Sequence, residues 1–177
     1  LSFLLMVGIF LPNTTFGATP EIIYDNASTP MLDARFSPPR QRYVNQNLEE
    51  IADPLQLGGT ARMITDIYFE YYGNFTAQGD ETARVRIYNN SKVYDNYRKS
   101  PTDTLYESGF FRIYQGYHVE HLQNLNLPVP DIISFGISFG GLAQNEDAGF
   151  LLYSPPSVGA SFNELWRRKP ASDWEVI

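Results

Sequence analysis

The two histidines of the chain lie three residues apart, in the segment Tyr117-His118-Val119-Glu120-His121. Alternate residues of a strand face opposite sides, so His118 and Glu120 would share one face and His121 would point the other way. A zinc site needs three or four convergent ligands, and the helical HExxH pattern is absent from the sequence. A Ser-His-Asp triad would have to use one of these histidines, and no GxSxG segment presents a serine. We therefore predict no metal site and no catalytic residues here, and interpret the segment as an exposed polar strand.

Acidic side chains offer two further kinds of chemistry, glycoside hydrolysis and Ca²⁺ binding. Asp66 and Glu70 share one face of a predicted strand, and carboxylates about 5–10 Å apart across a cleft can serve a glycosidase. Same-face acids are also normal on a solvated surface, so a glycosidase- or lyase-like enzyme is the least favoured alternative. We predict that the chain is not an enzyme and binds no cofactor.

Three acidic loops contain oxygen ligands suited to Ca²⁺, although none has EF-hand spacing. They are Asp25-Asn26, Asp95-Asn96 and Asn145-Glu146-Asp147. Asp and Asn are also among the commonest turn-forming residues. Turn formation is therefore the favoured interpretation, and a structural Ca²⁺ ion is the alternative.

Tyrosine is frequent, with 12 residues in 177, and not all of these rings can enter a core. An exposed row of Tyr or Trp can stack on sugar rings while neighbouring Asn and Asp bind the hydroxyl groups. The candidate glycan-stacking residues are Tyr72, Tyr88, Tyr94 and Tyr97. Strand propensity and edge burial also favour Tyr, so a structural role is the preferred interpretation and carbohydrate binding is the alternative.

Composition excludes several classes of protein. The chain has 13 Lys and Arg against 20 Asp and Glu, a net charge of −7, and no basic stretch. This balance argues against nucleic acid or an anionic membrane as the main partner. The absence of Cys excludes a disulfide scaffold, a thiol nucleophile, Cys-ligated zinc and iron–sulfur clusters. The length suits one domain with a core of ordinary size.

Residues 1–17 have the pattern of a secretory signal peptide. Leu1–Leu11 is uncharged and apolar, and as a helix it would span about 16 Å, too short for a bilayer core of about 30 Å. Pro12 and small or polar residues follow, with Thr15 and Gly17 suited to positions −3 and −1 of a cleavage site. We expect a signal peptide that lacks its own start; the alternative is a buried element of the mature domain. No later segment is long and apolar enough to span a membrane.

The remaining sequence predicts an irregular lead-in over 18–47 and one β-sandwich domain over 48–177. The lead-in is rich in Pro and Asn, with one good strand at Glu21–Tyr24, and Asn47–Pro54 has the pattern of a helical turn. Strand-like segments follow at intervals of about ten residues. They are Thr60–Tyr72, Ala83–Tyr88, Thr104–Ile113, Tyr117–Leu122, Ile132–Phe139, Gly149–Tyr153, Ala160–Trp166 and Trp174–Ile177. About eight short strands without an amphipathic helix indicate an all-β, antiparallel, jelly-roll-like sandwich.

The most apolar strands predict the core. Ile132–Phe139 and Gly149–Tyr153 are joined by a Gly-rich connection, so we expect them to pair as antiparallel neighbours. The residues expected to be largely buried are Phe135, Ile137, Phe139, Leu151, Val85, Ile87, Ile67 and Phe69, with Trp166 packing at one end.

Several segments, in this order, resemble a known family. Leu57-Gly58-Gly59-Thr60-Ala61-Arg62 leads into a hydrophobic strand, and Ala83–Tyr88 and Thr104–Gly109 follow. The closing segment Gly149–Gly159, with Phe162 and Trp166 after it, carries most of the likeness. Over residues 51–174, approximately, the chain resembles exported bacterial proteins that carry a PEP-CTERM-type C-terminal sorting signal.

The resemblance implies a β-sandwich secreted to the bacterial cell surface or extracellular matrix, with no catalytic residues to carry over. The Pro-Glu-Pro motif, apolar helix and basic terminus of the sorting signal are not in this sequence, and in a longer chain they would follow Ile177. We therefore predict a non-enzymatic exported surface or extracellular-matrix protein, whose partners are extracellular polysaccharide or other surface proteins. A carbohydrate-binding module that uses exposed Tyr or Trp is the alternative.

Overall fold

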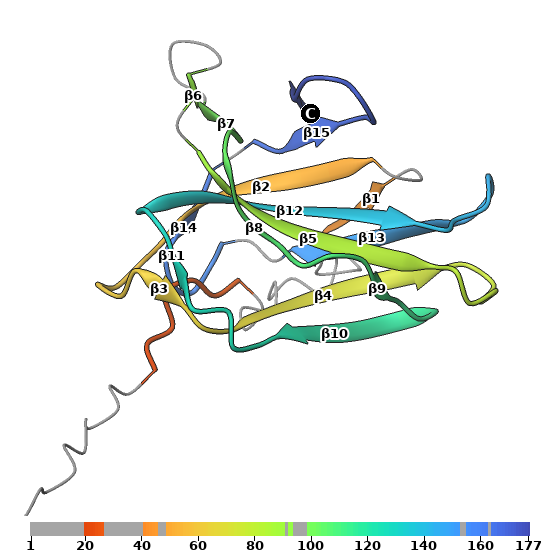
Figure 1. Cartoon of the computed structure of the whole chain (residues 1–177), viewed down its shortest axis with the longest axis horizontal. Coiled ribbons are helices and arrows are strands. Elements are labelled where there is room, and N and C mark those ends of the chain that lie inside the picture. The colour runs from red at the N-terminus through yellow and green to blue at the C-terminus, as the bar shows by residue number, and fades with distance from the viewer. Residues whose placement is uncertain are drawn as a thin grey trace, which may run out of the picture.

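The computed structural model describes residues 20–26, 41–45, 49–90, 92–93, 99–152, 155–162 and 164–177, and every regular element in them is a β-strand (Figure 1). The strands of four or more residues are β1 (Gln41–Asn45), β2 (Glu50–Gln56), β4 (Ile67–Asn74), β5 (Thr82–Asn89), β8 (Thr104–Glu107), β10 (Gly116–Leu122), β12 (Ile132–Gly140) and β13 (Asp147–Leu152). The shorter strands are β3 (Met63–Ile64), β6 (Lys92–Val93), β7 (Lys99–Ser100), β9 (Phe111–Arg112), β11 (Leu127–Pro128), β14 (Ala160–Ser161), β15 (Trp166–Arg168) and β16 (Glu175–Val176). Eight longer strands in the described residues confirm the predicted all-β class. No helix capable of spanning a membrane occurs in this described part.

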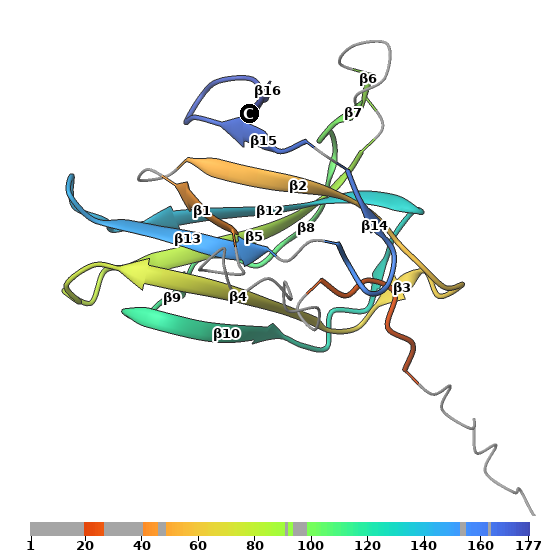
Figure 2. The ribbon, with the colours of Figure 1, turned by 180° about the vertical axis from the view of Figure 1, so that it is seen from behind.

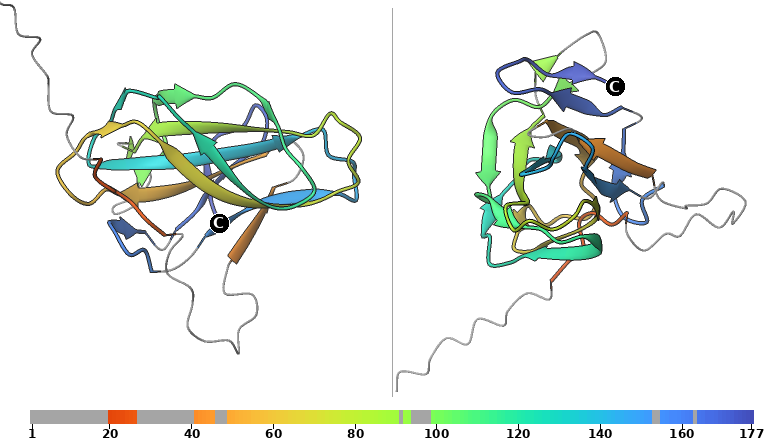
Figure 3. Two further views of the ribbon diagram at one scale, coloured as in Figure 1. Left: turned by 90° about the horizontal axis from the view of Figure 1, so that it is seen from below. Right: turned by 90° about the vertical axis from the view of Figure 1, so that its right-hand side faces the viewer.

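The longer strands form two antiparallel sheets with jelly-roll topology. The first sheet has the order β1-β13-β4-β10, and the second contains β2-β12-β5-β8, extended beyond β2 by β15 and β16 (Figures 1 and 2). Within the eight, the first strand pairs with the last, the second with the seventh, the third with the sixth and the fourth with the fifth. This nested pairing, wrapped into two layers, is the arrangement of a jelly roll. An end-on view shows the sheets facing each other around a common interior (Figure 3).

Alternating residues of each strand fill that interior, as period-two patterning predicts. Phe135 of β12 packs against Phe150 of β13 with ring centroids 6.2 Å apart, so the two rings connect the sheets. Of the residues expected to be buried, most are buried as predicted: Phe135, Ile137, Phe139, Val85, Ile87, Phe69 and Trp166. Ile67 and Leu151 are half-buried.

The predicted pairing of Ile132–Phe139 with Gly149–Tyr153 is wrong. β12 pairs with β2 along one edge and with β5 along the other, so neither edge is left for β13. The connection crosses instead from the second sheet to the first, where β13 lies between β1 and β4. Gly141 in this crossing has φ +75°, and a Cβ atom there would overlap the Asp80 carbonyl oxygen. Only glycine therefore fits this crossing without a shift of the backbone.

The N-terminal part of the described chain also differs from the prediction. β1 lies inside the predicted lead-in of 18–47, so the sandwich begins before residue 48. Glu21–Tyr24 is not a regular strand, and the segment contributes one isolated bridge, between Asp25 and Val158. The predicted signal peptide, 1–17, lies outside the described residues.

The predicted helical turn at Asn47–Pro54 is wrong, because Glu50–Gln56 forms strand β2. Pro54 is tolerated there for a geometric reason. Its carbonyl accepts a hydrogen bond from the Phe162 backbone N–H at 3.5 Å, so its main-chain polar atoms face away from β12. On that side β14 pairs with residues 55–56 and β15 with residues 50–52, so Pro54 lies in the interval between them. No ladder hydrogen bond therefore needs the N–H group that proline lacks.

Candidate functional site

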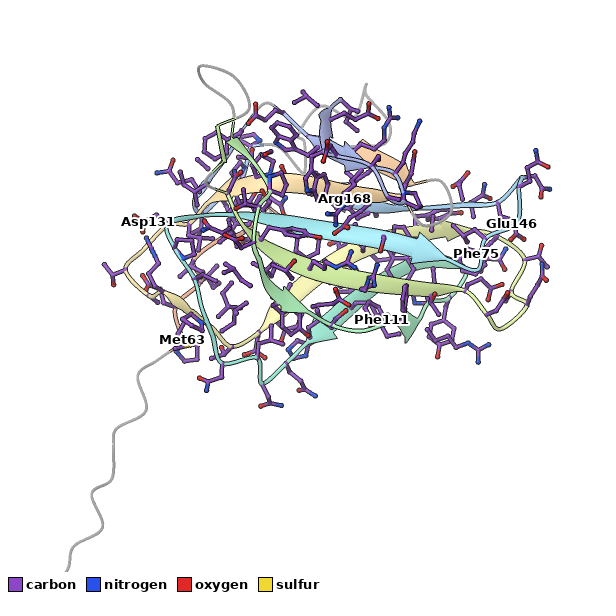
Figure 4. The ribbon with its side chains drawn as sticks, turned by 45° about the horizontal axis from the view of Figure 1, so that its top comes forward. Met63, Phe75, Phe111, Asp131, Glu146 and Arg168 are labelled. Atoms are coloured by element: carbon purple, nitrogen blue, oxygen red, sulfur yellow. The ribbon has the colours of Figure 1, made fainter. Side chains whose placement is uncertain are left out.

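A cavity of about 620 Å³ lies between the two sheets at the end of the sandwich where residues 20–26 run. Its walls are mainly apolar inward-facing side chains of both sheets. They include Ile67, Phe69, Ile87, Ile133, Phe135 and Phe150. Met63 lies at this end, whereas Phe75 and Glu146 mark the opposite end (Figure 4). The volume falls in the range of about 300–1,000 Å³ that is usual for small-molecule sites.

One carboxyl group, that of Asp53, lies in this apolar interior. On β2 the side chains of Ile51, Asp53 and Leu55 have the same orientation, so Asp53 occupies a position where an apolar residue is expected. The residue is only 4% exposed, and no described residue forms a hydrogen bond with its carboxyl group. Burial raises the pKa of Asp53 from 3.8 to about 8. The group is therefore mainly a neutral carboxylic acid at neutral pH, because ionising it without a partner costs free energy.

The hydroxyl group of Tyr24 is a second polar group in the same cavity. Its oxygen is buried and has no hydrogen-bond partner of good geometry among the described residues. Burial, and after it the nearby carboxyl of Asp53, raises the pKa of Tyr24 far above its usual value. Weak side-chain hydrogen bonds with Ser161 and Asn26 lower this pKa by a smaller amount. Buried polar groups are normally satisfied, so two such groups facing an apolar cavity indicate a place for a ligand's polar atoms.

Four more acidic residues contribute to the lining, and each of them interacts with another part of the protein. Glu21 accepts hydrogen bonds from the backbone N–H groups of Thr60 and Ala61, the latter at 2.9 Å. The others are Asp25, Asp66 and Glu70. None of the described lining residues is Lys, Arg or His. The described lining therefore contains acidic residues without basic ones, and Asp53 is the most deeply buried of these acids.

Sequence reasoning missed Asp53 because Pro54 follows it. The pattern of Asn47–Pro54 indicates a helical turn, and a helical turn has no two-residue alternation from which an inward position can be deduced. The signal that identifies it is the sequence Ile51, Asp53, Leu55, Leu57, in which one acid interrupts an otherwise apolar set of alternate residues.

A second cluster of charged residues, on the outer face of the second sheet, contains Glu50, Arg86, Tyr88 and Arg168. The Glu50 carboxylate accepts a hydrogen bond from Tyr88 at 2.6 Å and bonds from Arg86 and Arg168, each at 2.7 Å. Gly136 leaves room for this cluster, because a Cβ atom there would lie 2.7 Å from a Glu50 oxygen. These groups satisfy one another, so the cluster ties β15 to β2 and β5 rather than offering a binding site.

The four predicted glycan-stacking residues have different positions. Tyr72 lies on the outer face of the first sheet and is 42% exposed, as expected for a stacking residue. Tyr88 is 1% exposed; its hydroxyl donates a hydrogen bond to Glu50, and its ring packs against Trp174. A sugar therefore cannot stack on Tyr88, and the prediction for this residue is wrong. Tyr94 and Tyr97 lie outside the described residues.

Two tyrosines absent from that set lie on the same outer face as Tyr72. Tyr117 of β10 is its direct cross-strand partner and is 44% exposed. Tyr68 of β4 stacks on His121, with ring centroids 4.0 Å apart. We call Tyr68, Tyr72 and Tyr117 the aromatic face. The sequence contains a signal for this face, because Tyr68 and Tyr72 alternate along β4 with the buried residues Phe69 and Tyr71 and must therefore point outward.

The histidines and acidic loops have local partners. His118 and His121 point to opposite faces of β10, as predicted; His118 stacks on Tyr71, and His121 lies 2.8 Å from Asp66. In the loop before β13, Glu146 accepts hydrogen bonds from two backbone N–H groups. No group of three or more His, Asp or Glu side chains in the described part could hold a metal ion. The loop Asp95-Asn96 lies outside that part.

Comparison of the chain with protein-family models, with curated proteins and with solved structures finds no match. The functional conclusion therefore depends on geometry. Among the residues that the structure describes, two features have chemistry that the fold itself does not use: the cavity with Asp53 and Tyr24, and the aromatic face.

Proposed function

We propose that this chain is a non-enzymatic, exported binding protein that takes up a small, largely apolar ligand in the cavity between its sheets. The observation that carries the proposal is the Asp53 carboxyl, which is buried in the cavity without a hydrogen-bond partner among the described residues. Apolar walls supply most of the binding free energy in such sites, and a few polar groups fix the ligand's orientation. Asp53 and Tyr24 are groups of that kind.

The protonation states of these groups argue against a role for them as a general base or a nucleophile at neutral pH. A general base or nucleophile must be deprotonated to act, but burial keeps both Asp53 and Tyr24 in their neutral forms at neutral pH. Among the other carboxyls of the lining, Asp66 is hydrogen-bonded to His121, and Glu21 to the backbone. The arrangement therefore suits hydrogen bonding to a ligand.

Titration with N-phenyl-1-naphthylamine, a neutral probe whose fluorescence rises in apolar surroundings, tests this function. We expect saturable binding at one site per chain. Ile67→Trp, which puts a large ring on the cavity wall, should abolish the signal. Val119→Trp adds the same ring on the exposed face of β10 and should leave binding intact. Failure of the wild-type chain to bind, or equal binding by both variants, would contradict the proposal.

The aromatic face supports a second candidate function, recognition of an extracellular polysaccharide. The cross-strand pair Tyr72 and Tyr117 presents two rings on one exposed surface, beside Tyr68. Affinity electrophoresis through gels that contain soluble cellulose or chitin derivatives should show retardation, which Tyr72→Ala and Tyr117→Ala reduce. Tyr114→Ala is the control, because Tyr114 is exposed but precedes β10. Equal mobility with and without every polysaccharide would reject this function.

A further inference from the structure

We infer that the ligand of the inter-sheet cavity is an organic cation, with an apolar body and a protonated amine that pairs with Asp53. The inference rests on the proposed function and gives the chemical class of the ligand.

The first argument is the charge of the lining. Five of the residues that line the cavity are acidic, namely Glu21, Asp25, Asp53, Asp66 and Glu70, and Asp53 is the one of them at an inward-facing strand position. No basic side chain accompanies them among the described lining residues. A cleft that carries one sign of charge between low-dielectric walls concentrates ligands of the opposite sign. Cations are therefore attracted, and carboxylates or phosphates are repelled.

The second argument is the state of Asp53. A buried carboxylate is tolerated when it is paired, and Asp53 has no cationic or hydrogen-bonding partner in the described part of the chain. The Glu50 cluster shows how the same fold treats a buried acid that it does partner, because two Arg and one Tyr surround that carboxylate. Asp53 lacks such an arrangement, and a ligand ammonium would supply the missing positive charge.

The hydrogen-bonding chemistry agrees with this assignment. An ammonium group has N–H donors and no acceptor. Ionised Asp53 is an acceptor only, and the Tyr24 oxygen, which is also buried in the cavity, can accept a further bond. A carboxylate ligand has only hydrogen-bond acceptors, so it could not form a hydrogen bond with the ionised carboxylate of Asp53.

A metal ion does not fit the same space. Hard divalent cations need several oxygen ligands around one point, and no three acidic or histidine side chains of the described residues converge in that way. Around Asp53 the walls are Leu55, Ile87, Ile133 and Phe135, which would pack against a hydrocarbon body. The cation is therefore an organic one.

Competition between three ligands with the same alkyl chain tests the inference. Decylamine, 1-decanol and decanoate are titrated against bound N-phenyl-1-naphthylamine at about pH 8.5, where Asp53 is largely ionised and the alkylammonium keeps its proton. We expect decylammonium to displace the probe at a concentration about tenfold or more below that of decanol, and decanoate to be weakest. Asp53→Asn should bring decylammonium to the level of decanol. Asp131→Asn removes one acid outside the cavity and should change nothing.

The outcomes separate the two proposals. Equal displacement by decylammonium and decanol in a chain that binds the probe would overturn the cationic ligand and leave the binding function standing. Retention of the preference in Asp53→Asn, or its loss in Asp131→Asn as well, would also overturn the inference, because the general negative charge and not Asp53 would then select the ligand. Failure of the wild-type chain to bind the probe would reject both proposals.

Discussion

At the scale of single residues, two buried acids of the second sheet have opposite roles. Glu50 on the outer face has three hydrogen-bond donors, and Asp53 on the inner face has none among the described residues. The two residues are three apart on one strand, so strand parity alone decides which acid is integrated into the fold and which faces the cavity. We therefore expect substitutions of the two acids to change the free energy of unfolding in opposite directions.

Asp53→Asn should stabilise the fold, and the gain should grow with pH. In the unfolded chain the carboxyl ionises near its ordinary pKa of 3.8, whereas the folded carboxyl keeps its proton up to about 8. Between these values the folded state binds one more proton than the unfolded state, so the free energy of unfolding falls as the pH rises, by up to about 1.4 kcal/mol per pH unit. Urea unfolding of both proteins at about pH 4, 6 and 8 measures the difference. A gain that is constant across this range would contradict the raised pKa.

Glu50→Ala should have the opposite effect. Its removal leaves Arg86, Arg168 and the Tyr88 hydroxyl without their shared acceptor, and loss of one partner from a buried ion pair typically costs about 3–5 kcal/mol. The exposed pair of Arg167 and Glu175 provides the control, because Glu175→Ala should cost less than about 1 kcal/mol. Urea unfolding again gives both values, and similar costs would show that the Glu50 cluster does not hold β15.

At the scale of elements, β12 and β13 differ in a way that their similar apolar sequences do not reveal. β12 is covered on both faces, by the first sheet inside and by the Glu50 cluster outside, whereas β13 buries only one face in full. Phe139→Ala should therefore cost about 3–5 kcal/mol. Leu151→Ala, at a half-buried position, should cost clearly less, and His121→Ala should leave the melting temperature nearly unchanged. Thermal unfolding of the three variants would contradict this description if Leu151→Ala were the most damaging.

The accuracy of the sequence prediction also varied between elements. Strands β4, β5, β10 and β12 could be predicted because their side chains alternate or form apolar runs, which is the direct consequence of one or two buried faces. Pairing could not be predicted in the same way, since proximity along the chain favoured a hairpin between β12 and β13 that the jelly roll does not contain. The cavity depends on that long-range topology, because β2, β4, β12 and β13 all contribute to its lining.

At the scale of the whole molecule, strand β4 connects the two candidate functions. Its odd-numbered residues Ile67 and Phe69 line the cavity, and its even-numbered residues Tyr68 and Tyr72 form part of the aromatic face. The jelly roll thus places an apolar interior that contains one buried acid, Asp53, and an aromatic exterior on opposite sides of one strand. A protein exported to a bacterial surface would be able to use both, one for a small molecule and the other for a matrix polymer.

Export itself is the remaining prediction, and it concerns residues 1–17. An apolar run followed by small residues at positions −3 and −1 is the pattern that signal peptidase cleaves, so we expect cleavage after Gly17. Placed behind an initiator Met and two lysines and expressed in a bacterium, the chain should reach the periplasm with Ala18 as its first residue, as measured by intact-protein mass spectrometry. Thr15→Phe and Gly17→Phe put bulky side chains at the cleavage positions and should leave the precursor uncleaved. Recovery of the uncut wild-type chain from the cytoplasm would contradict export, and with it the proposal that the aromatic face binds an extracellular polysaccharide.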